Sequence, residues 1–291
     1  MRHARHLWIF VAWLTVIAGP IRAEESQPIG RGQLLYSRLT NGTWQVWKTD
    51  LATKEQVQLT SSPGDKRNPA WTPDGQITYR TSNHRCYLVE TGKPDKPLLA
   101  DLWPVRDITW SPNGTKIAFS KFRTDLVDSA NLWVANAAGE KERMITHEVG
   151  IQYQPAWSPD GKRIAYIGGH GYGTYELYVV SEDGTERRQL TQNRTHEFLP
   201  AWSPDGTQIA FSADASGDYE IWVMEANGSH ARQLTQSPGL DTRPVWSPDG
   251  TKIAFVTNRS GPLEIWTMNP DGTEQHLLEK AQGGVCDPVW R

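Results

Sequence analysis

The feature that most constrains this sequence is a short segment of the type Trp-Ser-Pro-Asp-Gly that recurs along the chain. The tryptophans that mark it are 39 to 47 residues apart, at Trp71, Trp110, Trp157, Trp202, Trp246 and, without the rest of the segment, Trp290. Two aromatic columns and one aliphatic column recur with the same rhythm, for example at Phe211, Trp222 and Leu234. A fixed period of about 40–50 residues is typical of repeat architectures built from β-strands.

Each repeat is predicted to form four short antiparallel strands. Segments such as 209–211 and 221–224 are β-branched or aromatic and are bounded by Gly, Asp and Ser, as strands commonly are. The Ser-Pro-Asp-Gly segment suits a type I turn, and Asp183-Gly184 and Asp271-Gly272 suit hairpin loops. Four strands per repeat, with no helical pattern between them, predict an all-β chain folded as a β-propeller.

The two ends of the repeat region are complementary. Residues 33–60 supply the last three strands of a repeat that lacks a first strand, and residues 287–290 supply a first strand with nothing after it. We therefore expect the C-terminal strand to join the N-terminal three in one blade, which closes a ring of six four-stranded blades. Such closure removes the exposed sheet edges that an open sheet would present.

Residues 1–23 have the pattern of a secretory signal peptide. Arg2 and Arg5 precede an apolar run of 13 residues, 7–19, which is followed by Pro20 and a small residue at Ala23. A membrane helix needs about 20 apolar residues, so no transmembrane span is expected. The prediction is a signal peptide over 1–23, a propeller over 24–291, and a monomer in the periplasm or outside the cell.

Charge and cysteine content narrow the function classes. The net charge is −3, and the loss of three arginines with residues 1–23 would make it −6. A mildly acidic protein lacks the positive field that holds phosphates, so no nucleic-acid partner is expected. The two cysteines, Cys86 and Cys286, exclude a disulfide-rich scaffold, and whether they pair stays open.

The segment Leu199–Thr235, with its PAWSPDG, EIWVM and RQLT runs, resembles the repeat of the TolB C-terminal propeller. The likeness extends over roughly residues 33–290. It implies a six-bladed ring and a binding surface for a lipoprotein such as Pal. In that family an α/β domain precedes the propeller and contacts TolA; only residues 24–32 precede the first strand here, so TolA binding is not expected. Related repeats also occur in peptidases and in sugar-degrading lyases, so the likeness specifies function weakly.

The candidate binding residues stand three positions before each recurring tryptophan, where the inner strands begin. Five of the six are polar: Asn68, Asp107, Gln154, Leu199, Arg243 and Asp287. The neighbouring Lys66, Arg67, Arg106 and Glu197 are expected to extend this surface, which would form the mouth of a central channel. Loops and strand ends on a rigid scaffold are common binding sites, although solvated polar residues capping a channel would show the same pattern.

An enzymatic alternative rests on three histidines. His147, His170 and His196 fall in loops predicted to lie on one face of adjacent blades, where imidazoles could hold Zn²⁺ or Mn²⁺ and Glu197 could act as a ligand or base. Scattered surface histidines would give the same arrangement, so neither a metal nor another cofactor is predicted. No Gly-x-Ser-x-Gly motif of a serine hydrolase occurs.

The leading expectation is therefore a non-enzymatic propeller that binds a protein or peptide of the cell envelope at the channel mouth, with a role in envelope integrity or transport. A metal-dependent, carbohydrate-active enzyme of lyase type is the alternative. A protein that binds a small glycan without chemistry is a third possibility that the sequence does not separate from the first.

Overall fold

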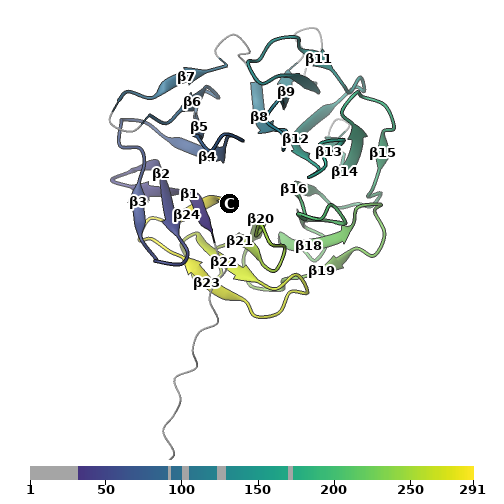
Figure 1. Cartoon of the computed structure of the whole chain (residues 1–291). Coiled ribbons are helices and arrows are strands. Elements are labelled where there is room, and N and C mark those ends of the chain that lie inside the picture. The colour runs from purple at the N-terminus through teal and green to yellow at the C-terminus, as the bar shows by residue number, and fades with distance from the viewer. Residues whose placement is uncertain (1–31, 91–92, 100–104, 123–128, 170–172) are drawn as a thin grey trace, which may run out of the picture.

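The computed structural model describes residues 32–90, 93–99, 105–122, 129–169 and 173–291, and all regular structure in these ranges is β-strand. The sheets follow one another around a ring in chain order (Figure 1). The chain is thus an all-β propeller, as predicted. The predicted signal peptide and His170 lie outside the described residues. No helix in the described ranges is long and apolar enough to cross a membrane.

Four sheets are clear four-stranded blades. Three of them are formed by consecutive strands, and their bounds are β4 (Lys66–Trp71), β5 (Ile77–Thr81), β6 (Cys86–Leu88) and β7 (Lys96–Leu98); β16 (Glu197–Trp202), β17 (Gln208–Ala213), β18 (Glu220–Glu225) and β19 (Arg232–Gln233); and β20 (Asp241–Trp246), β21 (Ile253–Thr257), β22 (Glu264–Met268) and β23 (His276–Glu279).

The fourth clear blade is built from both ends of the repeat region. It contains β24 (Val285–Trp290), β1 (Gln33–Thr40), β2 (Thr43–Asp50) and β3 (Gln56–Gln58), in that order. Leu34 pairs with Trp290 in antiparallel register, and the backbone N–H of Gln33 donates to the carbonyl of Arg291 at 2.6 Å. The predicted joining of the C-terminal strand to the N-terminal three is therefore confirmed.

The remaining strands form one eight-stranded sheet made of two consecutive antiparallel meanders. A single parallel bridge between Ala130 and Ile151 links them. The strands are β8 (Val105–Trp110), β9 (Lys116–Phe122), β10 (Ala130–Asn136), β11 (Arg143–Met144), β12 (Ile151–Trp157), β13 (Arg163–Gly169), β14 (Tyr175–Ser181) and β15 (Arg188–Gln189).

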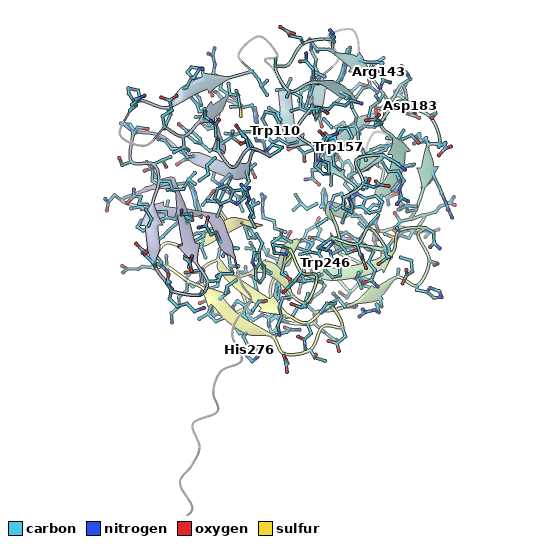
Figure 2. All side chains as sticks on the ribbon, viewed as in Figure 1. Trp110, Arg143, Trp157, Asp183, Trp246 and His276 are labelled. Atoms are coloured by element: carbon cyan, nitrogen blue, oxygen red, sulfur yellow. The ribbon has the colours of Figure 1, made fainter. Side chains whose placement is uncertain are left out.

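The recurring tryptophans join neighbouring sheets. Trp202 is 8% exposed and shares a hydrophobic cluster with Ile167 and Leu177 of the preceding meander. Its indole N–H donates to the carbonyl of Ala156 at 3.1 Å, and Trp246 repeats this bond to Ala201 at 3.2 Å. Trp110, Trp157 and Trp246 lie toward the centre of the ring, whereas Arg143, Asp183 and His276 lie at its outer edge (Figure 2). Packing between sheets therefore explains why the tryptophan repeats.

The Ser-Pro-Asp-Gly turn is formed as predicted. The N–H of Gly206 donates to the carbonyl of Ser203 at 2.9 Å, which closes the turn, and Gly206 has a positive φ of 71°. The Ser203 hydroxyl donates to Asp205 at 2.6 Å and accepts from the N–H of Gln208 at 2.9 Å. These bonds fix the tight connection from β16 to β17 on the face opposite the candidate site.

The two cysteines, Cys86 and Cys286, are both buried and are not joined in a disulfide.

Candidate functional site

The innermost strand of every meander is interrupted by a bulge at the candidate position. The register shifts there in all six strand pairs, and the bulged residue has a positive φ between 49° and 57° in each case: Asn68, Asp107, Gln154, Leu199, Arg243 and Asp287. Left-handed backbone is uncommon for residues other than Gly. A proline follows five of the six, and because proline has no N–H it suits a site where the ladder is interrupted.

Several bulged residues form hydrogen bonds from one meander to the next. Asp287 accepts from the N–H of Asn68 at 3.1 Å. Asp107 accepts from the N–H of Gln154 at 3.3 Å, and the Gln154 side chain accepts from the N–H of Leu199 at 2.8 Å. Leu199 cannot accept such a bond, and the N–H of Arg243 donates instead to the Ser212 hydroxyl at 3.2 Å. Asp287, Asp107 and Gln154 therefore satisfy backbone donors that the bulges leave free.

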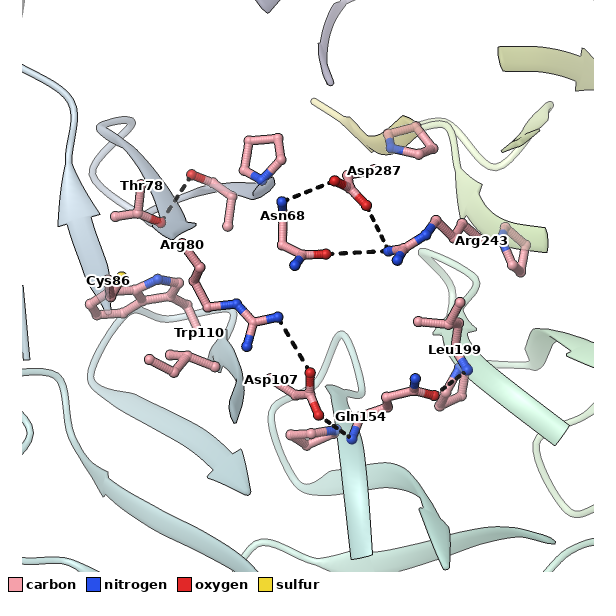
Figure 3. A pocket seen from close by; sticks show the side chains of 17 residues that line it. Asn68, Thr78, Arg80, Cys86, Asp107, Trp110, Gln154, Leu199, Arg243 and Asp287 are labelled. Atoms are coloured by element: carbon pink, nitrogen blue, oxygen red, sulfur yellow. Dashed lines mark hydrogen bonds and ion pairs between the residues drawn. The ribbon is translucent and has the colours of Figure 1, made fainter. Parts of the chain in front are cut away.

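These residues surround a central cavity of about 230 Å³ (Figure 3). All six bulged residues line it, whereas the neighbouring Lys66, Arg67, Arg106 and Glu197 do not. Arg80, from β5, lies beside them and reaches toward Asp107 across the cavity (Figure 3). The channel mouth predicted from the sequence thus corresponds to a cavity lined by charged, polar and apolar residues.

Asp287 anchors the first charged cluster. Its side chain is 2% exposed and lies 2.7 Å from Nε of Arg67 and 2.8 Å from Nη1 of Arg243. Arg243 also donates to Oδ1 of Asn68 at 3.2 Å. Burial by itself would raise the pKa of Asp287, but the charges of Arg243 and Arg67 outweigh it and hold that pKa well below its usual range. Asp287 is therefore ionised and fully engaged by neighbouring groups.

A second, looser cluster lies across the cavity. Nη2 of Arg80 is 3.4 Å from Oδ1 of Asp107, and the Arg80 side chain is 14% exposed. Nη1 of Arg80 is buried and has no hydrogen-bond partner among the described residues. Arg80 breaks the repeat, because the corresponding position holds small or aliphatic residues in the other meanders: Ser37, Ser120, Ile167, Ser212 and Val256.

The residues just before the bulges divide the rim of the cavity into two arcs. Arg67 and Arg106 occupy this position in β4 and β8, whereas Tyr153 and Phe198 occupy it in β12 and β16. The guanidinium of Arg67 stacks over Trp44 at 4.5 Å, and that of Arg106 stacks over Phe122 at 4.7 Å. A basic arc of Arg67 and Arg106 therefore adjoins an aromatic arc of Tyr153 and Phe198, and Thr242 and Cys286 hold the same position in β20 and β24.

The aromatic arc lines a groove of about 270 Å³ between β8, β12 and β16. The ring centroids of Tyr153 and Tyr175 are 5.6 Å apart and nearly perpendicular, at 80°. Phe198 lies 5.6 Å from Tyr175 and 5.5 Å from Tyr219. Asp107 lines both this groove and the central cavity, so the two hollows adjoin.

Two residues expected on this surface are buried instead. Glu197 is 1% exposed and accepts hydrogen bonds from Thr191, Asn193 and Thr195. Lys66 is 2% exposed, and its ammonium donates to the carbonyls of residues 62–64. Both side chains bind the connection that leads into their strand, residues 62–64 before β4 and residues 191–195 before β16. The prediction that they extend the binding surface is wrong.

The histidines of the enzymatic alternative do not form a visible metal site. Nδ1 of His196 lies 2.9 Å from Asp214, and His147 is exposed. His170 lies outside the described residues. Within the described ranges no group of three or more His, Cys, Asp or Glu could hold a metal ion.

Sequence reasoning missed Arg80 and the aromatic arc. Arg80 is detectable as the one charged residue in an otherwise small or aliphatic column. Tyr153 and Phe198 share one column of the repeat, but Tyr175 comes from a different strand, β14, and only the ring brings it beside them.

Comparison with known proteins agrees with this description. Residues 173–290 match the family model PD40, described as the TolB β-propeller domain. The Tol-Pal system protein TolB of Anaeromyxobacter dehalogenans (strain 2CP-C) is 30% identical over 125 residues, which is 41% of this chain and 28% of that relative. The match thus spans little more than a quarter of the relative's length.

Solved structures extend the likeness of fold to most of the chain. TolB from Acinetobacter baumannii superposes with a TM-score of 0.76 at 22% identity, over 89% of this chain and 66% of that one. An oligogalacturonate lyase in complex with manganese superposes with a TM-score of 0.60 at 18% identity, over 84% of this chain and 73% of the lyase. Residues 173–290 thus match the TolB β-propeller domain in sequence, and most of the chain shares the β-propeller fold of these structures.

Proposed function

We propose that this protein is an exported, non-enzymatic propeller that binds a protein or peptide partner at the rim of its central cavity. We infer that each meander of the eight-stranded sheet is a blade, which gives six blades in all. Export is inferred from the signal-peptide pattern of residues 1–23. A role in the cell envelope is inferred from the similarity to Tol-Pal system proteins. A Pal-like lipoprotein is the partner that this likeness favours.

The main support for the proposal is that three arginines near the cavity depart from the sequence repeat. Packing between sheets demands repetition, as the tryptophans show, but Arg67, Arg80 and Arg106 stand where other meanders hold aromatic, small or aliphatic residues. Residues that depart from a repeat without a packing reason are candidates for function. Arg80 lines the cavity, Arg67 pairs with Asp287 of its wall, and Arg106 lines the adjoining groove beside the exposed Phe122.

Site-specific photo-crosslinking in intact cells tests this proposal. A photoreactive amino acid replaces the exposed Arg106 at the rim, and the matched control replaces Asp183 in the exposed hairpin on the opposite face. We expect a discrete crosslinked species from position 106 and none from position 183. The crosslink should fall at least about fivefold with Arg243→Gln, because the rim loses a charged donor. Equal crosslinking at both positions would contradict the proposal.

A further inference from the structure

A second hollow lies on the face opposite the candidate site, where the connecting turns of two neighbouring sheets meet. It measures about 510 Å³ and lies between the turn after β4, residues 72–75, and the turn after β8, residues 111–114. A smaller hollow of about 310 Å³ adjoins it, since Thr72, Pro73 and Trp110 line both. Hollows of this size admit small molecules.

This hollow is open because the repeat changes at two positions. Between the two meanders of the eight-stranded sheet, Nζ of Lys116 lies 2.7 Å from Oε2 of Glu182 and bridges the corresponding gap. The matching positions here are Gln76 and Ala137, as the hydrogen bonds of the turns and hairpins show, and these two residues cannot form an ion pair. The turn is also one residue shorter, because the N–H of Gln76 bonds to the fourth residue before it and that of Lys116 to the fifth.

A tryptophan of the repeat forms one wall of the hollow. Four of the six recurring tryptophans are 6–8% exposed, whereas Trp71 and Trp110 are more exposed. The guanidinium of Arg291 stacks over the ring of Trp71 at 5.2 Å, and Trp110 lines both hollows. An indole ring has an apolar body and a negative face, so the C–H groups of a sugar ring can pack against it.

The polar side chains beside Trp110 offer both hydrogen-bond donors and acceptors. Oδ1 of Asn113 accepts bonds inside its own turn, which leaves the Nδ2 donors without a described partner. Asp74 accepts from the Thr72 hydroxyl through Oδ1 only. The side chain of Gln76 is exposed and bonds to no described residue. The groups that are free to meet a ligand are therefore mixed rather than uniformly basic or acidic.

We propose that this hollow, lined by Asp74, Gln76, Trp110 and Asn113, binds a neutral oligosaccharide. Hydroxyl groups donate and accept hydrogen bonds, and so they match a mixture of free donors and acceptors beside an aromatic ring. The site is separate from the rim of the central cavity. Its failure would therefore leave the proposed partner binding unchanged.

A peptide ligand fits this hollow less well. Extended peptides commonly bind through the protein backbone, as an added strand does at a sheet edge. The backbone of the two turns is already bonded, because the N–H groups of Gly75 and Gly114 donate to the carbonyls of Thr72 and Ser111 at 2.9 Å. Recognition here depends on side chains, which suits hydroxyl groups.

Isothermal titration calorimetry of the folded protein tests the inference. The neutral probes are cellotriose and triacetylchitotriose. A galacturonate trimer is the anionic probe, and acetylated, amidated trialanine is the peptide probe. At least one neutral probe should bind with a Kd below about 1 mM, and neither the anionic nor the peptide probe should bind more tightly.

Two variants test the assigned side chains. Gln76→Lys combined with Ala137→Glu installs the ion pair that Lys116 and Glu182 form at the next contact, which should close the hollow and weaken binding at least about tenfold with little change in Tm. Asn113→Asp keeps the Oδ1 acceptor of the turn but removes the Nδ2 donors, and should weaken binding at least about threefold. If the double variant does not fold, Asn113→Asp decides.

Two control variants should bind the neutral probe like the unchanged protein. Gln208→Ala changes the residue that matches Gln76 in the turn after β16. Arg243→Gln changes the central cavity, which Trp110 also lines, and so distinguishes the two sites. The inference is overturned if no neutral probe binds below about 1 mM, if the test variants bind equally well, if Arg243→Gln abolishes binding, or if the anionic or peptide probe binds more tightly.

Discussion

At the first position of β16, Glu197 is a carboxyl group enclosed between two sheets. Burial, together with the charge of Glu176, raises the pKa of Glu197 to about 7 against the lowering effect of hydrogen bonds from Asn193 and Thr195. Oε2 of Glu176 is itself buried without a hydrogen-bond partner among the described residues. Two acidic groups thus share one poorly solvated contact, and the free-energy cost of the Glu197 charge depends on pH.

Glu197→Gln is expected to stabilise the protein at alkaline pH. The folded-state pKa is above the unfolded value of 4.5, so the folded protein retains a proton that the unfolded chain releases. Stability therefore falls as pH rises from about 4.5 to about 7. The variant should gain about 2 kcal/mol at pH 8, or roughly 4–8 °C in Tm, and little at pH 4.

Thermal unfolding between pH 4 and pH 8 measures this difference. Glu186→Gln, in an exposed hairpin, is the control and should follow the unchanged protein at every pH. Parallel stability curves for the Glu197→Gln variant and the unchanged protein would show that Glu197 does not titrate in this range.

At the scale of elements, the bulges of the inner strands place the candidate residues. The bulge could not be predicted from the sequence, because Leu199 and Arg243 have no intrinsic preference for left-handed backbone. What the sequence did predict is the position of these residues along the strand. The twist of the chain at the bulge then decides that they point into the cavity and carry hydrogen bonds between sheets.

Two substitutions at Leu199 test whether the bulge is strained. Leu199 has a φ of 56°, which Asn tolerates better than Leu and which a β-branched residue tolerates worst. Leu199→Asn should stabilise the protein by about 0.5–1 kcal/mol, and Leu199→Val should destabilise it by about 1–2 kcal/mol. Urea unfolding measures both. If Leu199→Val were more stable than Leu199→Asn, apolar contacts of the Leu199 side chain, rather than its backbone conformation, would decide stability at this position.

For the whole molecule, ring closure depends on β24. Trp290 is 7% exposed in a cluster with Leu34, Tyr36 and Val285, and β24 covers the edge of β1. Deleting residues 285–291 should therefore expose that edge, broaden the unfolding transition and cause aggregation, as judged by calorimetry and size-exclusion chromatography.

A circular permutant provides the control for this deletion. It joins Arg291 to Gly32, which lie close together because Gln33 and Arg291 exchange backbone hydrogen bonds, and opens the chain in the exposed hairpin 270–273. The permutant keeps β24 in place and should unfold in one cooperative transition at a similar temperature. If the truncated chain also unfolded in one cooperative transition at the same temperature, ring closure by β24 would not be what stabilises the ring.

The sequence by itself determined the repeat, the four strands of each repeat, the turns and the joining of both ends in one blade. It could do so because packing between sheets imposes the same side chains at the same spacing, and such repetition is visible along a chain. Only the tertiary structure decided which candidate residues face the cavity. Glu197 and Lys66 bind the connections that precede their strands, whereas Arg80 lines the cavity and Phe198 lines the adjoining groove. These directions follow from bulges and from the curvature of the ring, which bring together residues that no spacing in the sequence connects.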